Sequence, residues 1–147
     1  MHLMHKDGYL LSDDKDRLDV ERVHRWLSKD AYWALGRELS RVQDSIAGSD
    51  SYGLYDAEHV QVGFCRVVTD QATFAWLCDV YIDPEHRGRG LGTWLVDQVR
   101  EVYAATGMRR MILATSDAHE VYSSVGFAPL SEPTRWMEIE FNPPRPA

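Results

Sequence analysis

Apolar residues recur at two different spacings along this chain, and the spacing changes where the predicted elements change. Over residues 18–27 and 35–46 they return every three or four positions, which predicts two amphipathic helices. We expect the first helix to start at Asp16 or Asp19, since an aspartate side chain can cap the free amides of a first turn. The second helix is expected to end before Gly48.

Strand patterns precede and follow these helices. A short apolar run at residues 9–11 is expected to form the first strand. Three longer runs rich in β-branched and aromatic residues, separated by short turns, predict an antiparallel meander: residues 51–56, 60–68 and 72–82. The last of them is expected to end at Asp83 and Pro84, because proline cannot donate to a strand ladder.

The rest of the chain alternates between helix and strand. Residues 91–102 carry one apolar helical face, which is expected to end by Gly107, and residues 110–115 form a short apolar strand. A short helix is expected over residues 117–126, and residues 135–141 alternate as a final strand would. A strand, a helix and a strand in this order predict a parallel β-α-β crossover.

These elements predict a mixed α/β fold in one domain over residues 1–147. We expect a central mixed sheet of about seven strands, with an antiparallel N-terminal meander joined to the parallel crossover and with helices on both faces. The two ends, residues 1–7 and 142–147, are expected to be flexible. The C-terminal end is rich in proline, which cannot join a ladder.

Composition narrows the classes of function. The net charge of −7 argues against a nucleic-acid partner, which requires a basic face; it suits a cationic substrate such as an amine, although many acidic proteins are acidic only for solubility. No apolar run has the length of a membrane span, so no membrane partner is expected. Cys65 and Cys78 fall in predicted strands without metal-ligand spacing, which indicates reduced, buried thiols, no metal site and a cytoplasmic location.

One stretch of the chain combines glycines with arginines between a strand and a helix: HRGRGLGTW, residues 86–94. Glycines permit positive φ and close approach of the backbone, and the first turn of a helix presents free N–H groups and partial positive charge. Together these features predict a cradle for a phosphate group. The alternative is a flexible turn with surface arginines. The stretch lacks the lysine of a P-loop and follows an antiparallel strand, which disfavours a nucleotide-binding P-loop and a dinucleotide fold.

Two motifs in this order resemble the GNAT superfamily of acyl-CoA-dependent N-acetyltransferases, over about residues 18–141. The family's pyrophosphate signature, Arg/Gln-x-x-Gly-x-Gly/Ala, stands here at residues 87–92 as RGRGLG. A later short helix with a tyrosine before Gly-Phe stands here as AHEVYSSVGF, with Tyr122, Gly126 and Phe127. The resemblance implies transfer of an acetyl group from acetyl-CoA to a primary amine by direct attack in a ternary complex.

The resemblance also implies where acetyl-CoA binds. The central strand is splayed from its parallel neighbour, so that its main chain at Val80, Tyr81 and Ile82 can pair with the pantetheine arm. The main-chain N–H of Val80 is a candidate donor to the reacting carbonyl oxygen. The diphosphate is expected on the loop and first helical turn formed by Arg87, Gly88, Arg89, Gly90, Leu91, Gly92 and Thr93.

Two residues are candidates for proton transfer. Asp79 interrupts an apolar strand and is the first candidate for the base that deprotonates the amine; the alternatives are a solvent-facing residue or a structural partner of an arginine. Glu120 and His119 are weaker candidates. The resemblance makes Tyr122 the general acid that protonates the departing coenzyme A thiolate, and the alternative is a core aromatic residue.

The acceptor pocket is expected where the first two helices meet, with Trp26, Tyr32 and Trp33 as its wall. An aromatic wall could hold an apolar amine or a cation, and ordinary helix packing is an equal explanation for Trp26. The acceptor is then a small-molecule amine or a protein amine. The alternative function is an acetyl-CoA-binding sensor or regulatory module without turnover. Dimerisation is common in the family, so a homodimer is compatible with the sequence.

Overall fold

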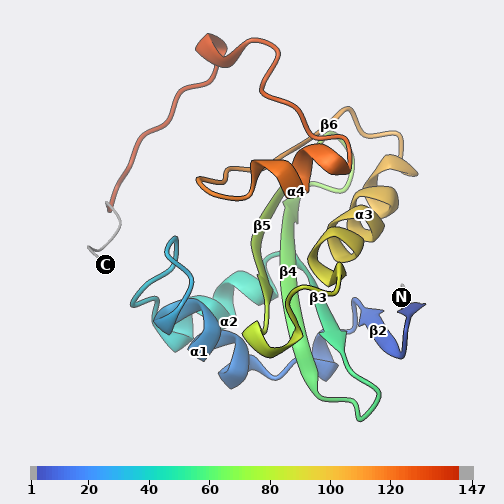
Figure 1. Cartoon of the computed structure of the whole chain (residues 1–147). Helices are drawn as coiled ribbons and strands as arrows, with labels where there is room; N and C mark the ends of the chain where they lie inside the picture. The colour runs from blue at the N-terminus through green and yellow to red at the C-terminus, as the bar shows by residue number, and fades with distance from the viewer. Residues whose placement is uncertain (1–2, 143–147) are drawn as a thin grey trace.

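A single mixed sheet forms the centre of the molecule in the computed structural model, which describes residues 3–142 (Figure 1). Within these residues the sheet has six strands, and their spatial order is their order in the sequence. β1 to β5 pair antiparallel and β5 pairs parallel with β6, so the predicted meander and the predicted crossover are both confirmed. The strands are β1 (Leu3–Lys6), β2 (Tyr9–Ser12), β3 (Asp50–Tyr55), β4 (Gln61–Thr69), β5 (Phe74–Ile82) and β6 (Arg110–Ile112).

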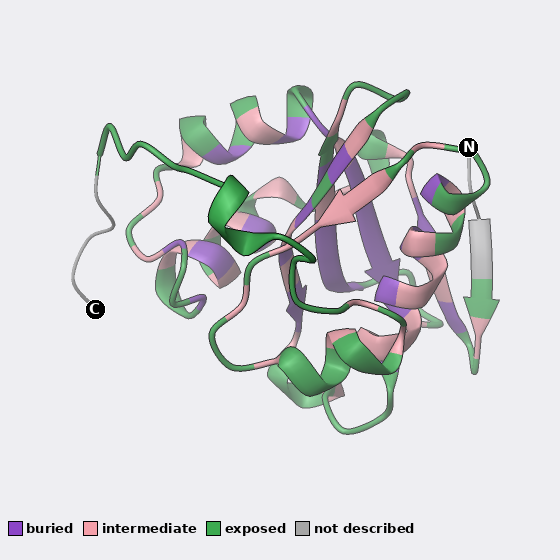
Figure 2. Ribbon diagram, turned by 90° about the horizontal axis from the view of Figure 1, so that it is seen from above, coloured by how far each residue is buried: buried purple, intermediate pink, exposed green. Residues whose placement is uncertain are grey.

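Helices cover both faces of the sheet. α1 (Val20–Lys29) and α2 (Leu39–Ala47) pack on one face, over Phe64 and Tyr81. α3 (Leu91–Ala104) packs on the opposite face and buries Leu95, Val96 and Val99 completely, with α4 (His119–Ser124) beside it. In Figure 2 the strands between the helices are buried, whereas the chain after α4 is exposed. Single 3₁₀ turns lie at η1 (Lys15–Arg17), η2 (Pro84–His86) and η3 (Pro133–Arg135).

The predicted start of α1 and the predicted end of α2 are both confirmed. Asp19 caps α1, because its carboxylate accepts a hydrogen bond from the Arg22 amide, and Gly48 follows the last residue of α2. α2 nevertheless starts later than predicted. Residues 32–36 form turns that end at Gly36, whose φ of +75° a right-handed helix cannot contain. Leu35 therefore lies in the connection between α1 and α2.

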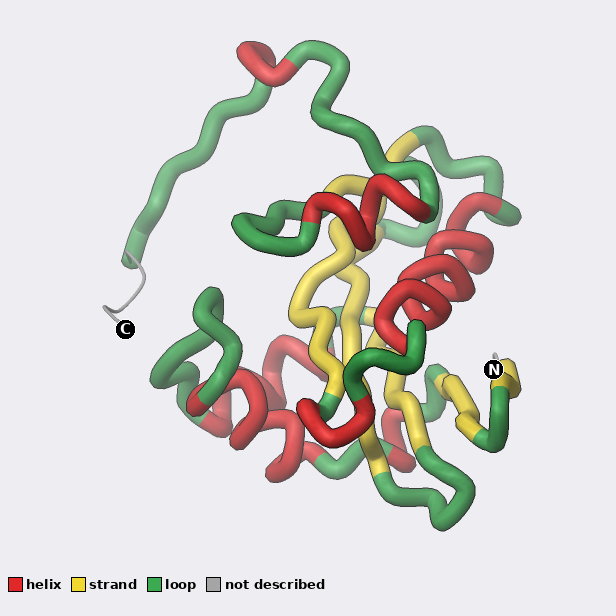
Figure 3. Tube along the Cα trace, viewed as in Figure 1, coloured by secondary structure: helices red, strands yellow, loops and turns green. Residues whose placement is uncertain are grey.

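The two ends of the sheet differ from the prediction. Leu3–Lys6 forms β1 against β2, where a flexible end was expected, whereas residues 1–2 and 143–147 lie outside the described part. Residues 135–141 were predicted to be a seventh strand, and this is wrong within the structure. The chain turns through η3 at Pro133 and continues as an exposed, extended segment without a ladder partner among residues 3–142 (Figure 3).

A β-bulge interrupts β5 near the point where β5 and β6 stop pairing. Phe64 lies opposite Tyr81 and Arg66 lies opposite Cys78, so two residues of β5 face one residue of β4 at Asp79, whose φ is +54°. β5 pairs with β6 only from Phe74 to Trp76. Beyond the bulge the two parallel strands diverge, and the second half of β5 has an open edge. The splayed central strand that the sequence predicted is thus present.

Candidate active site

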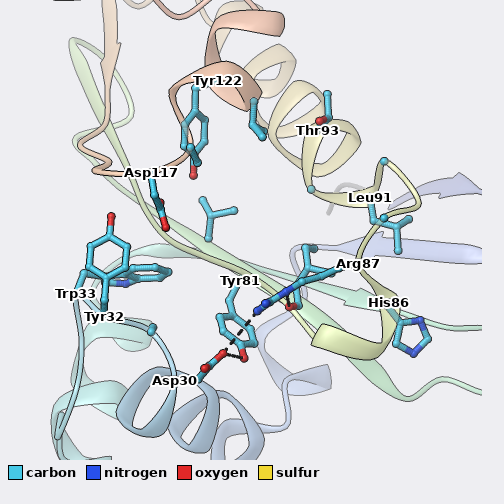
Figure 4. Close-up of a pocket in the computed structure, with 18 residues that line it drawn as sticks. Asp30, Tyr32, Trp33, Tyr81, His86, Arg87, Leu91, Thr93, Asp117 and Tyr122 are labelled. Carbon is cyan, nitrogen blue, oxygen red and sulfur yellow. Dashed lines mark hydrogen bonds and ion pairs between the residues drawn. The ribbon is translucent and has the colours of Figure 1, made fainter. Parts of the chain in front are cut away.

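The open edge of β5 borders a cavity of about 540 Å³. Val80 and Ile82 of β5 line it, and the first turn of α3 and the helix α4 form two of its walls (Figure 4). Asp30 and Ala31, at the end of α1, close the side opposite α3. The cavity therefore lies where four segments of the chain converge, residues 30–33, 80–82, 86–93 and 117–122, and it contains the predicted glycine loop.

Two glycines of the loop have backbone conformations that other residues avoid. The φ angles of Gly88 and Gly90 are +80° and +74°. A Cβ atom added at either residue would meet no protein atom within 4 Å, so both glycines border open space. Gly90 precedes α3, and no side chain caps this helix, so the first-turn amides from Leu91 onward are left for another acceptor. The geometry fits the predicted phosphate cradle.

The two arginines of the loop have different roles. Arg87 borders the cavity; its Nε donates to the Ile82 carbonyl oxygen at 2.8 Å, and its guanidinium lies over the Tyr81 ring and 3.6 Å from an Asp30 carboxylate oxygen. Arg89 does not line the cavity, and its guanidinium donates to the Tyr9 hydroxyl at 2.9 Å. Arg87 is therefore the loop arginine that can reach a ligand without rearranging. Thr93, one turn into α3, also lines the cavity.

Tyr122 reaches the same cavity from α4. Its hydroxyl points into the cavity in Figure 4, and no group among residues 3–142 hydrogen-bonds to it. Phe127 packs against its ring edge to face at 6.0 Å between centroids. Burial raises the pKa of Tyr122 to about 12, so the hydroxyl keeps its proton at neutral pH. The Tyr122 hydroxyl can therefore donate a proton or a hydrogen bond to a molecule bound in the cavity.

A second cavity of about 340 Å³ adjoins the first. Trp76, Leu77 and Cys78 of β5 and residues 113–115 after β6 form its far end. Its boundary with the first cavity consists of the residues that line both: Tyr32, Trp33, Val80, Asp117, Ala118 and Tyr122. Two molecules bound in the two cavities would therefore meet beside the Tyr122 hydroxyl.

Asp79 lies at the base of the second cavity and is fully engaged by other side chains. Its carboxylate accepts hydrogen bonds from Arg66 at 2.6 Å, from Arg37 at 2.8 Å and from the indole N–H of Trp33 at 2.8 Å. Burial acts to raise the pKa of Asp79, but the two guanidiniums outweigh it and lower that pKa below its usual value. A stabilised carboxylate is a weak base. This geometry favours the alternative that Asp79 is a structural partner of arginines.

The predicted aromatic wall is only partly assembled. Tyr32 and Trp33 line both cavities, and the Ser116 amide donates to the Tyr32 hydroxyl at 2.9 Å, which ties the α1–α2 connection to the loop before α4. Hydrogen bonding with Ser116, through its side chain and its amide, lowers the pKa of Tyr32. Trp26 lines neither cavity. It stacks on Tyr81 at 5.3 Å between ring centroids, with Arg22 on its ring, which is the helix packing considered as its alternative.

Two acidic residues that line the cavities, Asp30 and Asp117, were not predicted as site residues from the sequence. Asp117 borders both cavities and is exposed, and Asp30 accepts a hydrogen bond from the Tyr81 hydroxyl at 2.5 Å. Asp117 opens the predicted short helix, where an acid is expected on helix grounds alone, so its position gave no reason to single it out. Glu120 and His119, the weaker base candidates, line a different cavity on the far side of α4.

The thiols do not take part in the chemistry that the cavities suggest. Cys65 and Cys78 are both free, as predicted; Cys65 is buried and Cys78 is half-buried at the wall of the second cavity. Burial raises the pKa of Cys78 to about 12 and that of Cys65 well above its usual value. Both thiols stay protonated and unreactive at neutral pH. No helix within residues 3–142 is long and apolar enough to cross a membrane.

The fold and the two joined cavities define an acetyltransferase. The chain belongs to the acetyltransferase (GNAT) family, whose pattern it matches over residues 20–127. It is 32% identical over 136 residues to FG08082 of Gibberella zeae, which is named as an acetyltransferase; the match covers 80% of this chain and 77% of that protein. The family resemblance noted in the sequence is therefore confirmed.

Solved structures agree with this assignment. A GNAT-family protein from Xanthomonas campestris is 42% identical and superposes with a TM-score of 0.85, covering 95% of each chain. The spermidine N-acetyltransferase of Vibrio cholerae, solved with CoA and spermine, superposes with a TM-score of 0.68 over 84% of this chain and 82% of that one. Its identity to this chain is 16%, so this second likeness concerns the fold alone.

Proposed function

We propose that this acetyltransferase moves an acetyl group from acetyl-CoA to the primary amine of a small molecule. The amine attacks directly while both substrates are bound, and Tyr122 acts as the general acid. One observation carries the proposal: the two cavities meet at Tyr122, whose hydroxyl is protonated and has no partner among residues 3–142. This is the arrangement that a direct transfer between two bound molecules requires.

The residues of the first cavity suit acetyl-CoA, which when bound supplies the acetyl thioester. The free amides after Gly90, with Gly88 and Arg87, are placed to hold a diphosphate. The open edge of β5 beyond its bulge offers main-chain groups of Val80 and Ile82 to an extended arm, as an added strand would use them. Arg89 supports the loop through Tyr9.

The second cavity suits a small amine better than a protein segment. It holds about 340 Å³ and is walled by aromatic rings, including Trp33 and Trp76, which fits a compact ligand. The exposed Asp117 carboxylate at the junction is placed to attract an ammonium group and to orient it toward the first cavity. We propose Asp117, in place of Asp79, as the carboxylate that meets the amine.

Proton movements follow from the same geometry. An alkylamine has a pKa of about 10.4 and must lose a proton before it attacks, either to Asp117 or to water in the open cavity. Tyr122 then donates its proton to the sulfur atom that leaves. A coenzyme thiol has a pKa of about 8.5 in water, and burial raises the pKa of Tyr122 to about 12, so the proton transfer is uphill and is coupled to the breaking of the carbon–sulfur bond.

The direct route is favoured over an acetylated enzyme. Cys78 is the thiol that lines the second cavity, and its pKa of about 12 leaves almost no thiolate at neutral pH. Without an activated thiolate, no covalent acetyl-cysteine step is needed or supported.

Release of free coenzyme A thiol, measured with a panel of amines, tests the proposal. We expect thiol release that depends on both acetyl-CoA and one class of small amine, and that saturates in each. Saturable acetyl-CoA binding without thiol release for any amine or lysine peptide would contradict turnover and favour the alternative of a CoA-binding sensor. Release with lysine peptides alone would contradict the small-molecule acceptor but not acetyl transfer.

A further inference from the structure

Charged side chains line the second cavity in two separate groups. Asp117 lines both cavities and so lies at their junction, whereas Arg37, Arg66 and Asp79 line the second cavity alone. Among residues 3–142 these four are the charged residues of its lining. The junction therefore carries one negative charge, and the base carries two positive charges and one negative. We call Arg37 and Arg66 the arginine pair.

Asp79 neutralises the arginine pair only in part. Its Oδ2 accepts from Arg37 Nη1 at 2.8 Å and from Arg66 Nε at 2.6 Å, so one carboxylate oxygen is shared by two cations. The Asp79 side chain is 2% exposed, against 21% for Arg37 and 11% for Arg66. The carboxylate is therefore buried beneath the guanidiniums, which border the open space. The base of the cavity presents one excess positive charge to a ligand.

Asp79 also holds the arginine pair in place. Its Oδ1 accepts from the Trp33 indole N–H at 2.8 Å, and the bulge of β5 fixes its backbone. Arg66 comes from β4 and Arg37 from the connection before α2, so this one carboxylate joins three elements at the base of the cavity. Donors that are already held in place lose little freedom when a ligand binds. The arrangement suits a bound anion.

We propose that the acceptor is a small amine that also carries a carboxylate, such as an α-amino acid or an ω-amino carboxylate; this rests on the proposed function. Its ammonium group lies at Asp117, which points into the cavity together with Tyr122 (Figure 4). Its carboxylate lies on the arginine pair, where guanidinium N–H groups bind it by charge-assisted hydrogen bonds. One carboxylate offsets the excess positive charge, and one ammonium offsets Asp117. The zwitterion thus matches the cavity at both of its charged groups.

Other small amines fit this pattern of charges less well. A diamine with one ammonium at Asp117 would direct its second ammonium toward the arginine pair, where like charges repel. A simple alkylamine avoids this repulsion but leaves the excess positive charge unpaired. The net charge of −7 attracts cations in general, whereas the local pattern selects among them. The arginine pair is therefore the feature that sets the acceptor class.

Paired substrates test the proposal on the native chain. Each α-amino acid, and each ω-amino carboxylate of a length series, is compared with its carboxamide, which has the same shape and no negative charge. Thiol release gives kcat/KM at equal concentrations of unprotonated amine. For the best pair we expect kcat/KM to be at least about tenfold higher for the carboxylate, with the diamine of the same length below both. Equal values within every pair, or a preference for diamines, overturn the proposal.

Variants then assign the preference to the arginine pair. Arg37→Gln removes one charge that borders the cavity, so the ratio of kcat/KM for the carboxylate to that for its carboxamide should fall by about fivefold or more. Arg37→Lys keeps the charge and should retain most of the ratio. Arg22→Gln is the matched control, because Arg22 also pairs with an aspartate, Asp83 at 3.0 Å, but lines neither cavity. A ratio that Arg37→Gln leaves unchanged, in a variant with native circular dichroism, overturns the proposal.

The outcomes separate this proposal from the one on which it rests. Thiol release with amines, but without a preference for carboxylates, contradicts the acceptor class and leaves acetyl transfer standing. No thiol release with any amine contradicts the proposed function, and the acceptor class fails with it. The substrate pairs use the native chain, so they decide the proposal even where Arg37→Gln does not fold.

Discussion

In the proposed mechanism, Tyr122 is the residue at which the donor, the acceptor and the transferred proton meet. Its position is set by two elements: α4 carries it, and Phe127, just beyond the end of that helix, supports its ring. Its backbone and aromatic contacts explain its place in the core, whereas its hydroxyl has no structural use within residues 3–142. If the Tyr122 side chain only filled space, phenylalanine could replace it without loss of activity.

Replacing Tyr122 by phenylalanine therefore separates packing from chemistry. Tyr122→Phe keeps the ring and removes the proton donor, so we expect kcat to fall by about 100-fold or more with the Kd for acetyl-CoA within about twofold of native. Steady-state kinetics and calorimetry measure the two quantities. Unchanged kcat would remove Tyr122 from the acid role.

The pH dependence of kcat/KM also depends on the Tyr122 hydroxyl. Because burial raises the pKa of Tyr122 to about 12, the acid stays protonated up to about pH 11 and gives no descending limb below it. The amine, with a pKa of about 10.4, loses its proton as pH rises, so kcat/KM should climb from pH 7 toward pH 9 or so. A fall between about pH 8 and 10 that Tyr122→Phe retains would contradict Tyr122 as the acid.

We expect Asp79 to contribute to stability through its two ion pairs. Removing one partner of a buried ion pair leaves the other charges uncompensated, so Asp79→Asn should lower the free energy of unfolding by about 3 kcal/mol. Since the folded state lowers the pKa of Asp79, its contribution is complete above about pH 4 and is lost as pH falls through the lowered pKa. The native chain should therefore lose this contribution in acid, and the variant should not.

Denaturant unfolding at pH 7 and below measures this difference, and Asp117→Asn is its matched control. Asp117 is exposed, so Asp117→Asn should leave stability unchanged and raise KM for the amine. The account of Asp79 would be wrong if Asp79→Asn kept full stability while abolishing turnover, which is the behaviour of a general base.

At the scale of elements, the loop before α3 is the part that we propose to bind acetyl-CoA. Its glycines are needed for their conformation, since their φ angles are positive, and for the space around them. The uncapped start of α3 leaves its first amides without an internal acceptor. The bulge at Asp79 supplies the other half of the site, because it parts β5 from β6 where the cavity opens.

A pair of glycine variants separates an effect on acetyl-CoA binding from an effect of backbone strain alone. Gly90 and Gly107 have φ of +74° and +81°, and a Cβ at either meets no atom within 4 Å, so alanine strains both backbones equally. Gly90→Ala should weaken acetyl-CoA binding by about tenfold, because it distorts the cradle. Gly107→Ala, after α3 and away from the cavity, should leave binding unchanged. Equal affinity in both variants, measured by calorimetry, would contradict the cradle.

At the scale of the whole molecule, local patterns predicted local structure well. Residues 91–102 form α3 because their apolar period is helical, and residues 86–94 form a loop with positive-φ glycines before an uncapped helix start, as their sequence predicted. Asp79 was harder. Its partners Arg66 and Arg37 lie 13 and 42 residues away, and spacing cannot show which of two buried roles a carboxylate has.

Residues 135–141 show a different limit. Their alternation predicted a strand, but alternation does not say which sheet edge, if any, a segment joins. Among residues 3–142 the segment has no ladder partner, so its period of two marks an extended backbone outside the sheet.

A crystal structure with coenzyme A bound tests the account most directly. The account predicts the diphosphate on the amides that follow Gly88 and Gly90, the pantetheine arm along Val80 and Ile82, and the sulfur atom beside the Tyr122 hydroxyl. Coenzyme A bound elsewhere, with the glycine loop empty and the sulfur remote from Tyr122, would contradict it.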